Sequence, residues 1–149
     1  PNDNYIGNHS HVIPALIDRF IQASRLNLPF VTIWGDGSAT RDFLHVSDAA
    51  AGIVTVAERY DSVEPINLGS GVEPLIRELA ELIAELTQSN GSLVFDTSRP
   101  VGQTRRSLDA TRAKSLGILF SRDLRKGLGE TIAHRCMSES TLARQSTLH

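Results

Sequence analysis

The sequence is poor in the residues that define several protein classes, and these shortages narrow what it can be. One cysteine, Cys136, occurs among 149 residues, which excludes an internal disulfide framework and predicts a reducing compartment, the cytoplasm. The 11 glycines and 6 prolines are too few for a linker or a collagen-like repeat. No apolar run approaches the roughly 18 residues of a transmembrane helix, so we expect no membrane association.

Neither sign of charge dominates the chain. The 15 basic and 17 acidic residues give a formal net charge of -2 and a pI near 6.2. A general nucleic-acid binder usually carries a strongly basic face, so we expect no nucleic-acid partner. Hydrophobic residues make up 40% of the chain, enough for a packed core and too many for wholesale disorder.

Helical and extended hydrophobic patterns alternate along the chain, which predicts an α/β fold. Helical spacing of apolar residues predicts helices near 12–26, 47–59 (with Ser47 as its cap), 76–86, 110–116 and 122–134. Short extended runs predict strands at 30–34, 41–46, 65–68 and 93–95. Such strands are too few for a complete doubly wound sheet, so we expect one part of an α/β protein. We predict a domain over 1–135 and a disordered tail over 136–149.

A glycine-containing turn, Gly69-Ser70-Gly71, follows a predicted strand and precedes a helix. This is the position of a dinucleotide-binding turn, whose fingerprint needs a third small residue three positions after the second glycine. Pro74 occupies that position. A tight strand-to-helix turn is therefore the better interpretation.

Histidines offer a second group of candidates. His9 and His11 form a His-x-His pair, but Asp3 alone does not complete a ligand set nearby, so we predict no metal site. His11 could donate a proton near neutral pH or cap the helix that follows it. His45 lies in an apolar extended run, which favours a satisfied core histidine, and Cys136 has no visible activating partner.

Arginines and one tryptophan form a third group. Planar guanidinium groups suit bidentate recognition of phosphate, although a single arginine is more often ordinary solvated surface. Trp34 ends a predicted strand beside a turn and could either stack on a base or sugar or belong to the core. The arginines nearest predicted turns or loops, together with one on the first helix, are Arg19, Arg41, Arg99, Arg105 and Arg106.

Four segments of the chain resemble one known family. They are "PNDNYIGNHSHVIPALIDRF", "VTIWGDGSATRDFLHVSDAAAGIV", "INLGSG" followed by "IRELAELIAEL", and "FDTSRPVGQTRRSLDATRA". In order and with few insertions, they resemble the C-terminal half of extended short-chain dehydrogenases/reductases, the NAD-dependent epimerase/dehydratase family. The resemblance covers roughly residues 1–130.

The resemblance implies a nucleotide-sugar epimerase/reductase that epimerises a GDP-linked 4-keto-6-deoxy sugar at C3 and C5 and reduces it at C4 with NADP(H) or NAD(H). It implies a catalytic acid at His11, close to the nicotinamide cofactor, and a homodimer for the complete protein. A sugar-nucleotide 4-epimerase or 4,6-dehydratase is the alternative within the family. Positions that bind the nucleotide-diphosphate sugar in the family correspond to Val12, Arg19, Trp34, Arg41 and Arg106.

Several residues depart from the family pattern. Val101 replaces an aspartate that contacts substrate, which weakens the expected preference for GDP. Arg99 and Arg106 replace lysines and keep the charge. Leu75 replaces a threonine that opens a capping box with Glu78, which removes a cap worth about 1 kcal/mol. Ala133-His134-Arg135 stand where the family has aromatic residues.

Two family elements are absent from the sequence: the N-terminal Gly-rich cofactor turn and the Tyr-x-x-x-Lys pair. Tyr5 is followed four positions later by His9, and Tyr60 by Glu64, so neither tyrosine forms the pair. With Pro1 in place of a methionine, this predicts a fragment that lacks the cofactor-binding half and is inactive alone. The competing hypothesis is a degenerate, non-catalytic module that binds nucleotide sugars or a partner chain.

Overall fold

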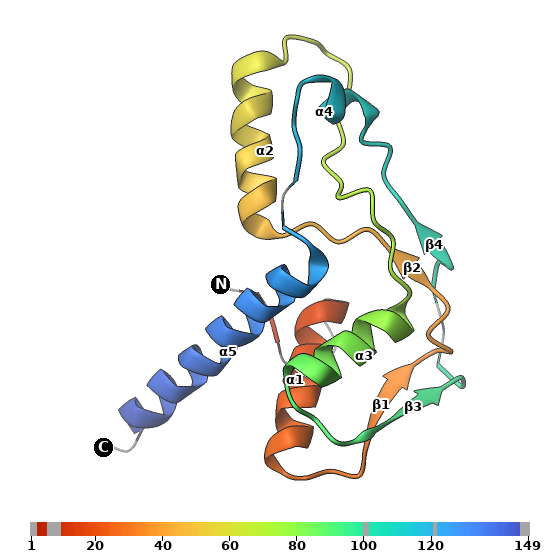
Figure 1. Ribbon diagram of the computed structural model, residues 1–149, viewed down its shortest axis with the longest axis vertical. Helices are drawn as coiled ribbons and strands as arrows, with labels where there is room; N and C mark the ends of the chain where they lie inside the picture. Colours follow the sequence, from red (N-terminus) through yellow and green to blue (C-terminus); the bar gives the residue numbers. More distant parts are fainter. Residues whose placement is uncertain (1–2, 6–9, 100–101, 121, 147–149) are drawn as a thin grey trace.

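The computed structural model describes residues 3–5, 10–99, 102–120 and 122–146, the side chains only as far as residue 138. Helices are interspersed with short parallel strands, which confirms the predicted α/β class (Figure 1). In chain order the elements are α1 (Val12–Arg25), β1 (Phe30–Trp34), β2 (Thr40–Arg41), α2 (Val46–Arg59), α3 (Ile76–Leu86), β3 (Ser92–Asp96), β4 (Arg105–Arg106), α4 (Thr111–Ser115) and α5 (Leu124–Ser146).

The strands form two small parallel sheets. β1 pairs with β3 from Phe30 opposite Ser92 to Trp34 opposite Asp96. β2 pairs with β4, which sets Arg41 opposite Arg106. Within the described parts of the chain each sheet has two strands, so the expected absence of a complete doubly wound sheet agrees with the structure.

The core lies where α1, α3 and the first turns of α5 meet β1. The helical spacing in α1 and α3 places apolar side chains on one face of each helix, and these faces pack together. Phe20, Ile17, Ile33, Leu79 and Ile83 are the largest fully buried side chains. Burial of this kind, at about 25 cal/mol per Å² of apolar surface, is the main stabilising contribution to the fold.

α2 lies outside this core, beside the segment that runs from α4 to α5 (Figure 1). Its buried residues are Asp48 and Gly52. A Cβ added at Gly52 would lie 3.2 Å from side-chain atoms of both Leu68 and Phe120, so the missing side chain permits this close packing. Val46, Ile53 and Val54 on the same helix are at least 57% exposed.

Two predicted strands differ from the structure. Residues 65–68 pair with no strand in the described chain; instead the Pro65 carbonyl accepts a hydrogen bond from Arg112. The Asn67 side chain donates to the Asp109 carbonyl at 3.1 Å. The strand predicted over 41–46 is also shorter in the structure, where β2 covers only Thr40–Arg41. Its partner β4 ends at Arg106, and Val46 already begins α2.

Two helix starts show different capping. His45, and not the predicted Ser47, occupies the N-cap of α2, and its Nδ1 accepts from the Ser47 backbone N–H at 3.3 Å. At α3 the N-cap is Leu75, whose side chain has no oxygen to accept a bond. The reciprocal half of the capping box survives, because Glu78 accepts from the Leu75 N–H at 2.9 Å.

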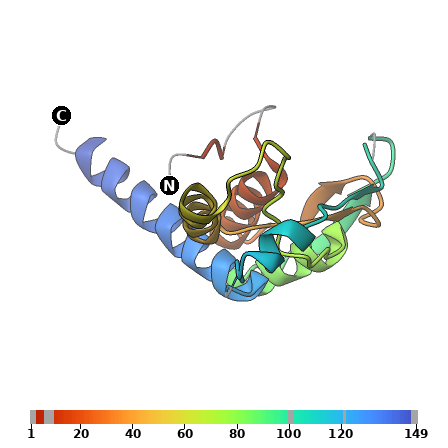
Figure 2. The same cartoon turned by 90° about the horizontal axis from the view of Figure 1, so that it is seen from above.

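α5 is longer than the sequence predicted. It continues to Ser146, where we expected a disordered tail from Cys136. Residues 136–146 contain no glycine or proline, and extending an existing helix adds one hydrogen bond for each residue fixed. The last turns of α5 project beyond the other elements (Figure 2). In the part of the chain described, no helix combines the length and the apolar character needed to span a membrane.

Candidate functional site

A cleft of about 770 Å³ lies between the start of α1, the 43–47 segment and the first turns of α5. Two of the predicted site residues, His11 and Val12, line it. The cleft also contains residues that the sequence did not single out as functional, among them Tyr5, Arg122 and Glu130. Its lining therefore combines an apolar floor with several titratable side chains.

His11 occupies the N-cap position of α1, but its side chain makes no capping hydrogen bond. Of the two roles left open by the sequence, side-chain capping is thus not the one adopted. The imidazole is 83% exposed, and its Nδ1 lies 3.5 Å from an oxygen of Asp3. An exposed imidazole beside a carboxylate can hold a proton and deliver it to a bound molecule.

Tyr5 lies at the same cleft beneath Arg135, whose guanidinium carbon is 4.8 Å from the ring centroid. Burial raises the pKa of the Tyr5 phenol, the Asp3 carboxylate raises it further, and Arg135 lowers it. The phenol therefore remains protonated at neutral pH. It can donate a hydrogen bond there, but it is a poor base.

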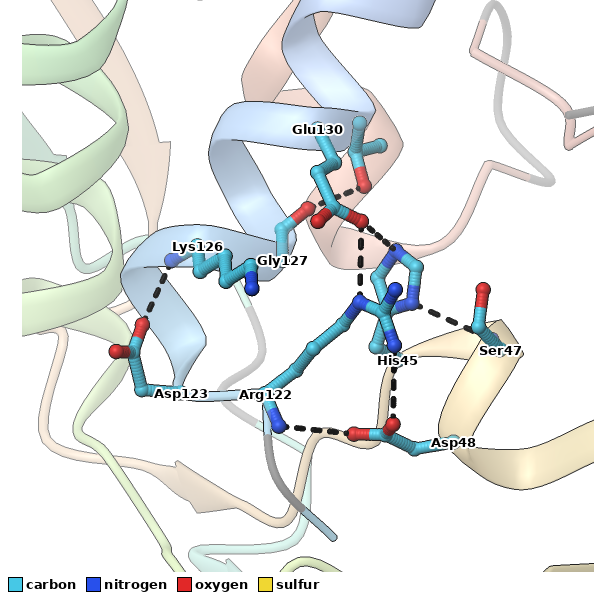
Figure 3. A network of polar contacts seen from close by, with 9 residues as sticks. His45, Ser47, Asp48, Arg122, Asp123, Lys126, Gly127 and Glu130 are labelled. Carbon is cyan, nitrogen blue, oxygen red and sulfur yellow. Dashed lines mark hydrogen bonds and ion pairs between the residues drawn. The ribbon is translucent and has the colours of Figure 1, made fainter. Parts of the chain in front are cut away.

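His45 belongs to a polar network on one wall of the cleft (Figure 3). Its Nε2 lies 3.7 Å from Glu130, which also accepts from Arg122 Nε at 3.1 Å. Arg122 also donates to the Asp48 carboxylate from its backbone N–H and from Nη1, each at 3.2 Å. His45 has polar partners, as predicted, but it is not a core histidine: it is half-buried at the cleft and caps a helix instead of lying in a strand.

Trp34 is flanked by two arginines at the carboxyl end of β1. The guanidinium carbons of Arg19 and Arg99 lie 5.4 and 5.2 Å from its ring centroid. Arg19 also donates to the Thr32 carbonyl at 3.1 Å, which fixes its direction along the strand. Trp34 is 51% exposed, so of its two predicted roles the core role is excluded.

Arg41 and Arg106 are brought together by the β2–β4 pairing, which places them directly opposite each other. Arg41 donates to the Thr40 carbonyl at 2.6 Å, and neither guanidinium forms an ion pair with any residue that the structure describes. The neighbouring Arg105 behaves differently, since Glu73 holds it by two bonds of 2.7 and 2.9 Å. Like charges directly opposite on paired strands are destabilising, and a bound anion would relieve that repulsion.

The predicted site residues thus fall into three places. His11 and Val12 line the cleft, Arg19 flanks Trp34, and Arg41 faces Arg106; the lining of the cleft includes none of the last four. His9 and Val101 lie outside the described residues. Within those residues no group of three His, Cys, Asp or Glu side chains is arranged to hold a metal ion.

The Gly69-Ser70-Gly71 turn is occupied by a side chain that sequence reasoning missed. Asp42 accepts from the Ser70 N–H at 2.8 Å, the Ser70 hydroxyl at 2.6 Å and the Gly71 N–H at 3.2 Å. These amides are the groups that would cradle a phosphate in a dinucleotide-binding turn. The rejection of a cofactor role for this turn agrees with that geometry.

The family resemblance is confirmed by comparison with known proteins. Residues 1–69 match the NAD dependent epimerase/dehydratase family. The chain is 44% identical over 130 residues to the putative GDP-L-fucose synthase 2 of Arabidopsis thaliana, covering 87% of this chain and 40% of that protein. The chain therefore spans about two fifths of the length of this curated relative.

Solved structures show the same fold. A GDP-L-fucose synthetase from Naegleria fowleri bound to NADP has a TM-score of 0.88 and 27% identity, over 95% of this chain and 44% of that one. A UDP-glucose 4-epimerase from Thermotoga maritima with UDP-glucose has a TM-score of 0.80 and 25% identity, over 93% of this chain and 43% of that one.

Proposed function

From its similarity to the NAD dependent epimerase/dehydratase family, we propose that this chain is the sugar-nucleotide-binding part of an NAD(P)-dependent epimerase/reductase. The proposed substrate is a GDP-linked 4-keto-6-deoxy sugar, which is epimerised at C3 and C5 and reduced at C4. The relative from Arabidopsis thaliana is a putative GDP-L-fucose synthase, a name that supports this choice of substrate class.

The opposed pair of Arg41 and Arg106 carries the proposal. Two guanidinium groups that face each other across a ladder without a described counter-ion repel one another. A nucleoside diphosphate brings two adjacent negative groups of the size that planar guanidinium forks bind in bidentate fashion. Binding such a diphosphate turns the repulsion into two charge-assisted contacts.

Trp34 and its two arginines support the same substrate. Its half-exposed ring offers an apolar surface to a base or sugar. Arg19 and Arg99 at the ring add positive charge, which favours a ligand that combines an aromatic or sugar ring with phosphates.

In the proposed chemistry His11 is the acid that returns a proton to carbon after the opposite face has been deprotonated. Its exposure at the cleft and its contact with Asp3 suit a residue that exchanges protons with a bound sugar. A nicotinamide cofactor would supply the hydride. The Gly69-Ser70-Gly71 turn is not available to its pyrophosphate, because the Ser70 and Gly71 amides already donate to Asp42.

We therefore expect no turnover of NADPH by the 149-residue chain alone. The measurement is loss of absorbance at the NADPH band with a 4-keto-6-deoxy sugar nucleotide present. Oxidation that scales with the amount of protein would contradict this expectation.

Binding of GDP to the 149-residue chain tests the proposed site directly. Calorimetry and Trp34 fluorescence, which reports one position because the chain has 1 tryptophan, should give the same dissociation constant. Arg41→Ala and Arg106→Ala should each weaken binding about tenfold or more, since one charge-assisted contact is worth about 1.5–3 kcal/mol.

Arg125→Ala is the matched control, because Arg125 is an exposed arginine paired with Glu85 on α3. It removes the same charge from a helix outside the proposed site and should leave GDP affinity unchanged. No binding by a demonstrably folded wild-type chain at millimolar GDP would refute the proposed function.

A 4-epimerase or 4,6-dehydratase that uses another nucleotide is the second candidate, supported by the likeness to a UDP-glucose 4-epimerase. Because Val101 replaces an expected aspartate, we expect no strong preference for GDP over UDP. The coding sequence upstream of Pro1 separates both enzymes from a non-catalytic module. A Gly-rich turn and a Tyr-x-x-x-Lys pair encoded there would support an enzyme, and a stop codon would support the module.

A further inference from the structure

Asp42 directly follows β2, and its carboxylate is bonded to the turn at residues 69–71. Its two oxygens accept three hydrogen bonds from the turn at Ser70 and Gly71, all between 2.6 and 3.2 Å. No arginine in the described chain forms an ion pair with it, although Arg41 is its immediate neighbour. The carboxylate thus binds the turn and does not neutralise Arg41, whose guanidinium donates only to the Thr40 carbonyl among the described contacts.

The backbone of Asp42 is fixed as well. Its N–H donates to the Arg106 carbonyl at 3.3 Å, which continues the β2–β4 ladder by one bond. Successive side chains of a strand point to opposite faces, so the turn is held on one face and Arg41 projects from the other. Asp42 therefore links β4 to the 69–71 turn, and the two links together fix the direction in which Arg41 projects.

Glu73, a few residues after the turn, makes the complementary contact on β4. Its carboxylate accepts from Nε and Nη2 of Arg105. The guanidinium of Arg105 is therefore held at Glu73. The ladder itself is only two residue pairs long and sets two like charges opposite each other. A ladder this short needs bonds from outside it to persist before a ligand arrives.

We propose that Asp42 is a positioning residue, which anchors β2 to the 69–71 turn and so holds Arg41 and Arg106 side by side for an anionic diphosphate. This role rests on the proposed function, since it acts through the same two arginines. Preorganisation of this kind raises affinity because the free protein already populates the binding geometry. Asp42 itself does not touch the ligand.

Asp42→Asn separates positioning from simple electrostatics by the sign of its effect. Removing a negative charge beside two arginines makes the site more positive, which by Coulomb attraction alone would tighten GDP binding. Loss of the anchor should instead weaken it, by about three- to tenfold. In an Arg41→Ala/Arg106→Ala background, Asp42→Asn should cause no further loss, because its effect passes through those side chains.

Gly69→Ala gives an independent test that keeps the charge. A Cβ at position 69 would come within 2.6 Å of the Asp42 Oδ2 atom, so it must displace the carboxylate from the turn. It should weaken GDP binding in the same direction as Asp42→Asn. Asp109→Asn is the matched control, since Asp109 accepts from the N–H and hydroxyl of Thr111 at 2.9 and 2.6 Å and should bind GDP like the wild type.

The measurements are calorimetric dissociation constants for GDP on 149-residue chains whose folding is verified by circular dichroism. If the wild type binds and Arg41→Ala weakens binding, but Asp42→Asn and Gly69→Ala bind as tightly as wild type or more tightly, the positioning role is overturned and the proposed function stands. If the wild type does not bind, both fall together. If Asp42→Asn does not fold, Gly69→Ala decides alone.

Discussion

Arginine side chains in this protein have two kinds of surroundings. Arg105, Arg122 and Arg125 bind carboxylates through hydrogen bonds of 2.7–3.2 Å, and those carboxylates raise the pKa of each guanidinium. Arg41 and Arg106 have no such partner in the described chain. Composition cannot distinguish the two kinds, because both consist of exposed or half-exposed arginines near loops.

His11 gives the residue-scale prediction of the proposed function. In a protein that includes a cofactor-binding half, His11→Asn should slow proton exchange into C3 and C5 by about 10²–10⁴-fold, the usual contribution of a general acid. Reduction at C4 should change less, because the hydride comes from the cofactor. Deuterium incorporation followed by NMR measures the exchange steps.

The control for this variant is His134→Asn, which changes another histidine of the same cleft. It should leave proton exchange near the wild-type rate. Unchanged exchange in His11→Asn would remove His11 from the mechanism.

At the scale of elements, the contact between α1 and α5 depends on a buried ion pair. Arg135 donates to Asp18 at 2.7 Å, and their side chains are 14% and 9% exposed. Gln22 also donates to Asp18, at 2.6 Å. Asp18→Asn should lower the free energy of unfolding by about 3 kcal/mol, because it removes the buried negative charge that accepts from both Arg135 and Gln22.

The comparison variant is Glu85→Gln, which breaks the contact of Arg125 between α3 and α5. Both partners of that pair are more than half exposed, so solvent screens their attraction. Urea unfolding should show a clear loss for Asp18→Asn and little change for Glu85→Gln. Equal losses would mean that burial of the first pair is not what gives it strength.

The sequence pattern predicted the long amphipathic helices and β1. It failed where local structure depends on contacts with segments that are distant in the sequence. α1, β1 and α3 lie close to their predicted bounds, because one apolar face of each determines its period and its burial. Residues 65–68 have the composition of a strand, but a strand exists only with a neighbour to bond. His45 as a cap and Asp42 as an anchor depend on bonds across space that spacing along the chain does not report.

Over the whole molecule, several exposed or half-buried carboxyls make the fold sensitive to acid. Hydrogen bonds from Ser38, Ser98 and Thr111 lower the pKa of Asp36, Asp96 and Asp109 below the ordinary 3.8. Bonds from Arg105 and Arg125 lower the pKa of Glu73 and Glu85 below 4.5 in the same way. The folded chain therefore binds protons less readily than the unfolded chain at these five groups.

A depressed folded-state pKa adds stability above the unfolded pKa, and this stability is lost as the pH falls through the folded pKa. From these groups we expect no change in thermal midpoint down to about pH 5, and a decline below about pH 4.5. Asp109→Asn should make the decline shallower, because it removes one titrating group. A midpoint that stays constant down to about pH 3 would contradict the expectation.

The pairing of β1 with β3 has a consequence for the order of folding. Phe30 lies opposite Ser92, so β2, α2, α3 and their connecting segments must be enclosed in one loop before this sheet exists. Closing a loop of about 60 residues costs chain entropy before any ladder bond compensates for it, and such non-local pairing slows folding. During biosynthesis α1 and β1 would leave the ribosome before β3, so Val31 and Ile33, which are buried in the folded chain, would lack their neighbouring strand until β3 is made.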